Sequence, residues 1–174
     1  VHAAESLYKV NQVGDGKAMT RAMQQQENLR LRLMAAAAMA RQGNPQAVPL
    51  IRTYLTNDDL EVRRIAVWLL GRLGSEADIP RIRPLIESSD EPLFRAYCQH
   101  SLAALGDPAG LTALEKNLSS DDGAIRTYAA TFAGDAQATH LKDKLIRNLE
   151  DPQLDARIRA AQTLLYFAHQ ASCP

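Results

Sequence analysis

Apolar and polar residues between Leu60 and Asp90 follow the period of two short amphipathic helices. The first segment places its apolar side chains on one helical face, and the second segment resumes the same period near Ile79. Gly74 and Ser75 interrupt the pattern between the two segments and predict a turn. Because a lone helical hairpin cannot bury its apolar faces, the pattern predicts hairpins that stack on one another.

The pattern recurs along most of the chain at steps of 31 or 32 residues. An arginine marks each step, a small residue follows it by three positions, and an acidic residue precedes each later arginine by five or six positions. A series of this length predicts an all-α fold: an α-solenoid of about five repeats and roughly eleven helices in a right-handed superhelix. The marked positions are Arg32, Arg63, Arg95, Arg126 and Arg157, then Ala35, Ala66, Cys98, Ala129 and Ala160, and then Asp58, Asp90, Asp121 and Asp151.

The repeats are expected to form one domain that spans residues 1–174. A capping repeat at 1–27 contains helices at 2–12 and 17–26 around a Gly14–Asp15–Gly16 turn. Gly134 and Asp135 come early in their repeat and predict a shortened first helix there. Full repeats are predicted at 28–59, 60–90, 91–121 and 122–152, with a half repeat at 153–170; outside 60–90 their helices are expected at 28–41, 45–56, 91–105, 108–118, 122–134, 138–149 and 153–169.

These repeats resemble the HEAT repeat family in its short form of roughly thirty residues, found in phycobilisome-lyase-type proteins. The resemblance rests on the Asp-to-Arg steps, on the small residue after each arginine, and on Leu73–Gly74, Leu105–Gly106, Pro49 and Pro80. It covers about residues 29–170. It implies second helices that line an inner, concave surface, and it is specific for the fold because the matched residues hold repeats together.

The bulk composition argues against several classes of protein. Twenty basic and 20 acidic side chains give a formal net charge of zero, unlike proteins dedicated to nucleic acid or membrane surfaces. No apolar run is long enough for a membrane span. Cys98 takes the small-residue position of its repeat, so it and Cys173 are expected to be unpaired thiols. The start at Val1–His2–Ala3 is similar to the end of a signal-cleavage site, so the compartment, cytoplasmic or exported, stays open.

No sequence pattern points to catalysis, a cofactor or a metal. None of the four histidines is followed by glutamate, so the iron site of the HEAT-like deoxyhypusine hydroxylases is not expected, and the two cysteines lie too far apart for a zinc motif. Phosphate-binding and nucleophile-elbow motifs are also missing. The acidic residues recur before each first helix, where they are expected to cap helix N-termini and to pair with the repeat arginine. Trp68 and His100 share a repeat position and are expected to pack at the outer rim.

The second helices carry a mild excess of positive charge although the chain as a whole is neutral. Their basic residues outnumber Glu87, Glu115 and Asp143. This pattern favours a groove for an acidic peptide, a protein loop or a phosphate-bearing ligand, and a solvated polar face is the simpler alternative. The candidate partner-binding residues are Arg52, Arg81, Arg83, Lys116, Lys142, Lys144 and Arg147.

The leading interpretation is a non-enzymatic scaffold that binds another protein on the concave face of the solenoid. The resemblance also implies an alternative, a subunit of a phycobilin lyase or isomerase. Nucleic-acid binding, as in the HEAT-like alkylpurine DNA glycosylases, is less favoured because Trp68, the single tryptophan, maps to a first helix on the opposite side. The apolar face of the last helix is expected to contact a further domain or a second copy of the chain.

Overall fold

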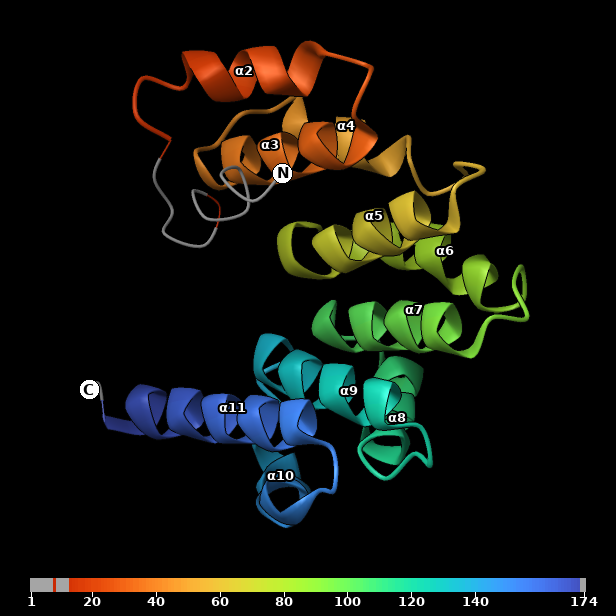
Figure 1. Cartoon of the computed structure of the whole chain (residues 1–174), viewed down its shortest axis with the longest axis vertical. Helices are drawn as coiled ribbons and strands as arrows, with labels where there is room; N and C mark the ends of the chain where they lie inside the picture. Colours follow the sequence, from red (N-terminus) through yellow and green to blue (C-terminus); the bar gives the residue numbers. More distant parts are fainter. Residues whose placement is uncertain (1–7, 9–12, 173–174) are drawn as a thin grey trace. The chain divides into compact units, whose positions relative to one another are not determined.

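The computed structural model describes Tyr8 and residues 13–172. Helices make up its regular structure and no strand occurs in that part of the chain, so the all-α class is confirmed. The chain divides into two compact units, Val1–Gly74 and Ser75–Pro174 (Figure 1). The boundary falls inside the predicted repeat 60–90, whose first helix belongs to one unit and whose second helix belongs to the other.

The first unit is built around one central helix. Its helices are α2 (Lys17–Gln24), α3 (Leu29–Arg41), α4 (Ala47–Arg52) and α5 (Leu60–Leu73). α3 packs against the other three, and its four consecutive alanines, Ala35 to Ala38, are all buried. Alanine has no side chain beyond Cβ, so several helices can approach α3 closely at once. The predicted Gly14–Asp15–Gly16 turn is also present, with both glycines at positive φ.

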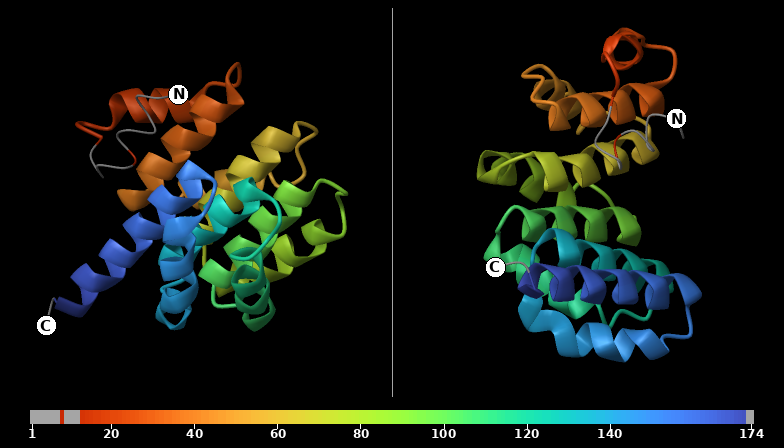
Figure 2. Two further views of the ribbon diagram at one scale, coloured as in Figure 1. Left: turned by 60° about the horizontal axis from the view of Figure 1, so that its bottom comes forward. Right: turned by 90° about the vertical axis from the view of Figure 1, so that its left-hand side faces the viewer.

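The second unit repeats a simple stacking scheme. Its first helices, α7 (Pro92–Ala104), α9 (Gly123–Asp135) and α11 (Leu154–Ser172), lie side by side in chain order (Figures 1 and 2). The second helix α8 (Pro108–Asn117) packs on α7 and α9, and α10 (Lys142–Arg147) packs on α11. Its shorter elements are η1 (Glu76–Asp78), α6 (Ile79–Ile82), η2 (Arg83–Ile86), η3 (Thr139–Leu141) and η4 (Asn148–Glu150).

The repeat positions predicted for the core are buried. The small residues Ala35, Ala66, Cys98, Ala129 and Ala160 are all 0 % exposed, so the interpretation of Cys98 as a core residue is confirmed. One apolar residue from each second helix is equally buried: Ile51, Ile82, Leu114 and Leu145. Burying one such aliphatic side chain stabilises the fold by about 1.5–3 kcal/mol. The need for an apolar residue at these positions therefore explains much of the repeat pattern.

The five marked arginines all occupy the same place in the local structure. Each is the fourth residue of α3, α5, α7, α9 or α11. Arg63 donates to the carbonyl of Asn57 at 2.7 Å, and Arg157 donates to the carbonyl of Asp151 at 3.0 Å. Arg32 reaches back in the same way to the carbonyl of Met23. These arginines therefore tie down the chain before their own helices, because a guanidinium can satisfy carbonyls that lie outside the helical ladder. Arg95 is exposed instead.

Two of the predicted acidic clusters cap the first helices. The capping side chains are Asn28, Asp59, Glu91 and Asp122, each of which accepts a hydrogen bond from a backbone amide of the first helical turn. Asp59 and Asp122 are the second residues of the predicted clusters Asp58–Asp59 and Asp121–Asp122, because the cap must be the last non-helical residue. Before α7 the cap is Glu91 and not the repeat residue Asp90. Asp151 accepts from the amide of Gln153, as Asn57 accepts from that of Asp59.

Two further expectations about helices are corrected. The second helix of repeat 60–90 is broken into η1, α6 and η2, because Pro80 and Pro84 lack the amide hydrogen that an α-helix needs. The second helix at 138–149 is likewise divided into η3, α10 and η4. The prediction that Gly134 shortens its first helix is wrong, since α9 has 13 residues, as do α3 and α7.

Gly134 serves helix packing instead of a turn. A Cβ atom at Gly134 would lie 3.3 Å from Oγ1 of Thr163, so glycine allows α11 to approach α9 closely. The left-handed residue after α9 is Gln137, with φ 50°, where the turns after α3 and α7 have Gly43 and Gly106. The sequence signal at Gly134 therefore reported close contact and not the end of a helix.

Some expectations fall outside the described residues. These are the helix at 2–12 apart from Tyr8, the cleavage-like start at Val1–His2–Ala3, and Cys173. Among the residues that are described, no helix combines the length and the apolar character needed to cross a membrane. The repeat borders at 28–59, 60–90, 91–121 and 122–152 stay predictions.

Candidate interaction surface

The second helices α8 and α10 contribute neighbouring charged side chains in the second unit. Lys144 Nζ lies 3.2 Å from Glu115 Oε1 and donates to the Glu115 carbonyl at 3.3 Å. The amide side chain of Asn148 donates to the carbonyl of Leu118 at 3.1 Å, which holds the C-terminal ends of the two segments together. We define the α8–α10 surface by the charged residues of these two helices: Glu115, Lys116, Lys142, Asp143, Lys144 and Arg147.

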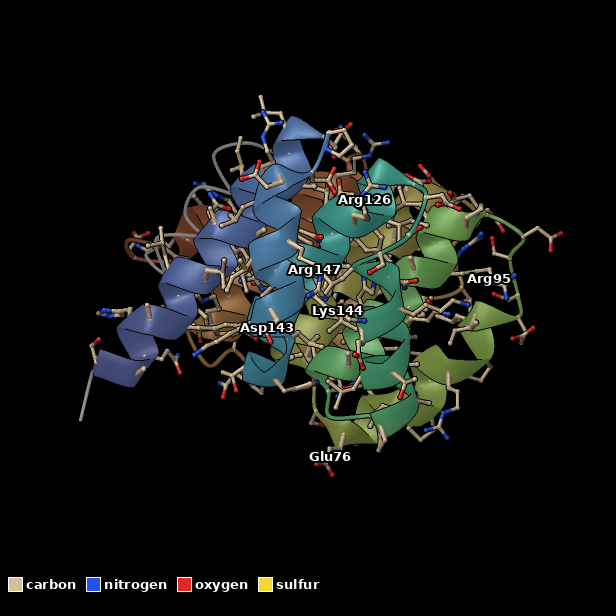
Figure 3. The ribbon with its side chains drawn as sticks, turned by 90° about the horizontal axis from the view of Figure 1, so that it is seen from below. Glu76, Arg95, Arg126, Asp143, Lys144 and Arg147 are labelled. Atoms are coloured by element: carbon tan, nitrogen blue, oxygen red, sulfur yellow. The ribbon has the colours of Figure 1, made fainter. Side chains whose placement is uncertain are left out.

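The α8–α10 surface has an excess of cations. Figure 3 shows Lys144 on the side of α10 that faces α8, with Arg147 about one turn further along the same helix. Lys116, Lys142 and Arg147 are exposed, and no residue in the described part of the chain forms an ion pair with them. Four basic side chains thus stand beside two acidic ones, Glu115 and Asp143, of which only Glu115 is in an ion pair. The surface is therefore positively charged at neutral pH.

Two of the predicted partner-binding arginines have contacts within the fold. Arg83 forms an ion pair with Asp107, the residue that caps α8 by accepting from the amides of Ala109 and Gly110. Burial alone would raise the pKa of Asp107, but Arg83 and the two amides outweigh burial and hold the pKa below its usual value. Arg81 donates to the carbonyl of Ala77 at 2.6 Å.

The remaining predicted cation, Arg52, is half-buried in α4 and belongs to the first unit. It is therefore not part of the α8–α10 surface. Of the seven candidates, Lys116, Lys142, Lys144 and Arg147 lie on the second helices α8 and α10, and Lys144 makes an ion pair with Glu115 between these helices.

An ion pair that joins α9 to the turn before α11 was not foreseen from the sequence. Arg126 uses Nε and Nη2 to bind both oxygens of Asp151, at 2.6 and 2.8 Å, and its Nη1 donates to the carbonyl of Ser120. The Arg126 guanidinium holds the pKa of Asp151 below its usual value, although partial burial opposes this. One sequence feature could have revealed this ion pair. Asp151 is acidic at a repeat position where the earlier repeats have the uncharged residues Asn57, Ser89 and Ser120.

His100 lies in the core, so the expectation that it packs at the rim is wrong. Its side chain is 0 % exposed, its ring centroid lies 5.3 Å from that of Phe132, and Nε2 lies 3.0 Å from Nδ2 of Asn117. Burial lowers the pKa of His100 to about 3, so the imidazole is neutral at physiological pH. Trp68 is half-buried in the first unit, with its ring edge-on to Tyr8 at 6.2 Å.

The groups with shifted pKa values are occupied by structural contacts. Asp107, Asp151 and Arg126 are in ion pairs, and His100 has no exposed surface. Within the described residues, no three His, Cys, Asp or Glu side chains gather in a way that could hold a metal ion. A shallow surface depression in the first unit is lined by Asp15, Lys17, Thr20 and Arg21.

Comparison with known families identifies the repeats. A family model described as HEAT repeats matches residues 16–103, which is just over half of the chain and runs from the start of α2 almost to the end of α7. No curated protein matches the sequence.

Proposed function

Because the chain belongs to the HEAT repeat family, we propose that it is a non-enzymatic scaffold that binds an acidic segment of a partner protein on the α8–α10 surface. HEAT repeats are commonly protein-interaction scaffolds, and such proteins are typically not enzymes. The partner-binding residues in this proposal are Lys116, Lys142, Lys144 and Arg147. Arg81 and Arg83 are left out because their guanidinium groups already serve contacts inside the second unit.

The observation that carries the proposal is the set of exposed cations without a counter-ion. Lys144 is in an ion pair with Glu115. The other cations, Lys116, Lys142 and Arg147, are exposed and can pair with an acidic ligand. Positive charge on one face raises the rate of encounter with an acidic segment and disfavours basic ones. Because an exposed ion pair contributes only about 0.2–1 kcal/mol, the interaction is expected to be weak and sensitive to salt.

A fluorescein-labelled Glu/Ser peptide tests the charge preference directly. We expect its fluorescence anisotropy to rise when the 174-residue chain is added, with an affinity that falls as salt concentration increases. The double variant K142E/R147E should bind at least about tenfold more weakly, since two attractive contacts become repulsive.

The controls separate this surface from general charge effects. Arg21 and Arg30 are exposed on α2 and α3, so R21E/R30E changes the net charge by the same amount in the first unit. That variant should bind the peptide within about twofold of the unchanged chain, after allowance for net charge. Equal losses in the two double variants, or no binding at low salt, would refute the proposal.

A further inference from the structure

Helix α11 exposes large apolar side chains on the side opposite its buried face. Leu154, Ile158 and Leu165 are 57, 43 and 70 % exposed, and Ala161 lies between them at helical spacing. We call these four residues the α11 stripe. The helix packs on α9, α10 and η4 through a different set of residues, and Figure 1 shows it as the outermost first helix of its unit. The buried residues of α11 are Ala156, Ala160, Thr163 and Phe167.

In the preceding repeat, the positions that correspond to the α11 stripe lie on α9 and face the first helix that follows it. One step of 31 residues earlier, the matching residues of α9 are Gly123, Thr127, Ala130 and Gly134. Ala130 accepts a hydrogen bond from Thr163 Oγ1 at 2.8 Å, and a Cβ at Gly134 would lie 3.3 Å from the same atom. Ala130 and Gly134 of α9 therefore contact α11. The α11 stripe is the corresponding face of α11, and its large side chains are exposed among the described residues.

The size of the side chains separates this face from the other stacking faces. The residue matched to Leu165 is Ala40, Gly71, Ala103 and Gly134 in the four preceding first helices. Small residues there let neighbouring helices approach closely, as Gly134 does for α11. Leucine would hold a further first helix away, so the α11 stripe is not suited to stacking another repeat as α11 stacks on α9.

We propose that the α11 stripe binds the same stripe of a second copy of this chain, with the two helices antiparallel across a two-fold axis near Ala161 and Gln162. In this arrangement Ile158 of each chain contacts Leu165 of the other. The dimer therefore contains two equivalent Ile158–Leu165 contacts, which bury all four side chains. Ala161 lies at the crossing point, where its small side chain allows close approach. The stripe is thus complementary to itself, as a two-fold interface requires.

The charges beside the α11 stripe fit the same arrangement. On one flank Asp155 comes opposite His169 of the second copy, which can donate a hydrogen bond to a carboxylate. Arg159 lies further round the helix, where its Nη1 donates to Oε1 of Gln162 at 3.1 Å. Arg157, on the other flank, meets no basic residue. The antiparallel pairing therefore opposes no like charges, which would otherwise disfavour two identical surfaces.

Analytical ultracentrifugation of the full chain over a range of concentrations tests this pairing. We expect a reversible monomer–dimer equilibrium. I158K and L165E should each raise the dissociation constant by about a hundredfold or more, because the symmetric dimer loses two apolar contacts. An equimolar mixture of the two variants should recover the dimer, since I158K meets L165E on one side while the native Ile158 and Leu165 meet on the other.

The mixture of I158K and L165E tests the antiparallel pairing of the two helices as well as their association. Both substituted residues are exposed, so circular dichroism of each variant should match that of the unchanged chain. Q170E, on the same helix but away from the α11 stripe, is the matched control and should leave the dissociation constant unchanged. A chain that stays monomeric at every concentration overturns the proposal, and so does a mixture in which association is not recovered.

Discussion

At the scale of single residues, buried ionisable groups decide how the stability of this protein depends on pH. Asp107 and Asp151 have pKa values below their usual range because each is paired with an arginine and with backbone amides. Their contribution is present above about pH 4 and is lost as pH falls through their lower folded pKa values. His100 affects stability over a different pH range, because burial lowers its pKa to about 3 and keeps the imidazole neutral above that pH.

The variant H100L tests the contribution of His100. Between pH 6.5 and 3 the unfolded chain binds a proton at this histidine and the folded chain does not, so stability falls as pH falls. At pH 4.5 this costs about 3 kcal/mol relative to pH 7. Leucine cannot titrate, and Asn117 still has Gln99 as an acceptor at 2.9 Å. Urea unfolding should show that H100L removes most of the decline in unfolding free energy between pH 6.5 and 4.5.

The control for this experiment is H140Q, because His140 is exposed in η3. Its unfolding free energy should decline with falling pH as steeply as that of the unchanged chain. If H100L declines just as steeply, the histidine is not held neutral by burial and the interpretation is wrong.

At the scale of helices, Gly110 lets α8 approach the backbone of α7 closely. A Cβ atom at Gly110 would lie 2.5 Å from the backbone nitrogen of Ala103 and 2.8 Å from the carbonyl carbon of Leu102. We therefore expect G110A to lower the free energy of unfolding by about 2–4 kcal/mol, since backbone atoms must move apart to admit one methyl group. Denaturant unfolding measures the change.

The matched control is G123A in the first turn of α9. There a Cβ would lie 3.4 Å from the side chain of Gln153, which is ordinary contact, so a change within about 1 kcal/mol is expected. Equal losses in G110A and G123A would show that helix propensity or chain entropy, and not the α7–α8 contact, governs both sites.

The helices show where sequence periodicity succeeds and where it stops. The first helices could be placed because their apolar spacing and caps act locally, and α3, α7 and α9 begin and end within two residues of the prediction. The second helices could be located but not their breaks, since segments of three to six residues are too short to distinguish the 3.0-residue period of a 3-10 helix from the 3.6-residue period of an α-helix. Gly134 misled because glycine marks both helix ends and close helix contacts.

At the scale of the whole molecule, the sequence establishes repetition but not the boundary of the compact units. Residues 60–90 form one repeat by pattern, yet the boundary between the units lies between Gly74 and Ser75. The candidate surface was similarly only half predictable. The sequence identifies the cations of the second helices, whereas their counter-ions, such as Asp107 for Arg83, come from distant positions that only the fold brings near.

The most direct measurement of the proposed binding surface is an NMR titration of isotope-labelled chain with the Glu/Ser peptide. We expect that amide signals from α8 and α10 shift progressively, that signals from α2 and α3 do not, and that K142E/R147E abolishes the shifts. Shifts that are confined to other helices, or that persist unchanged in K142E/R147E, would contradict this expectation.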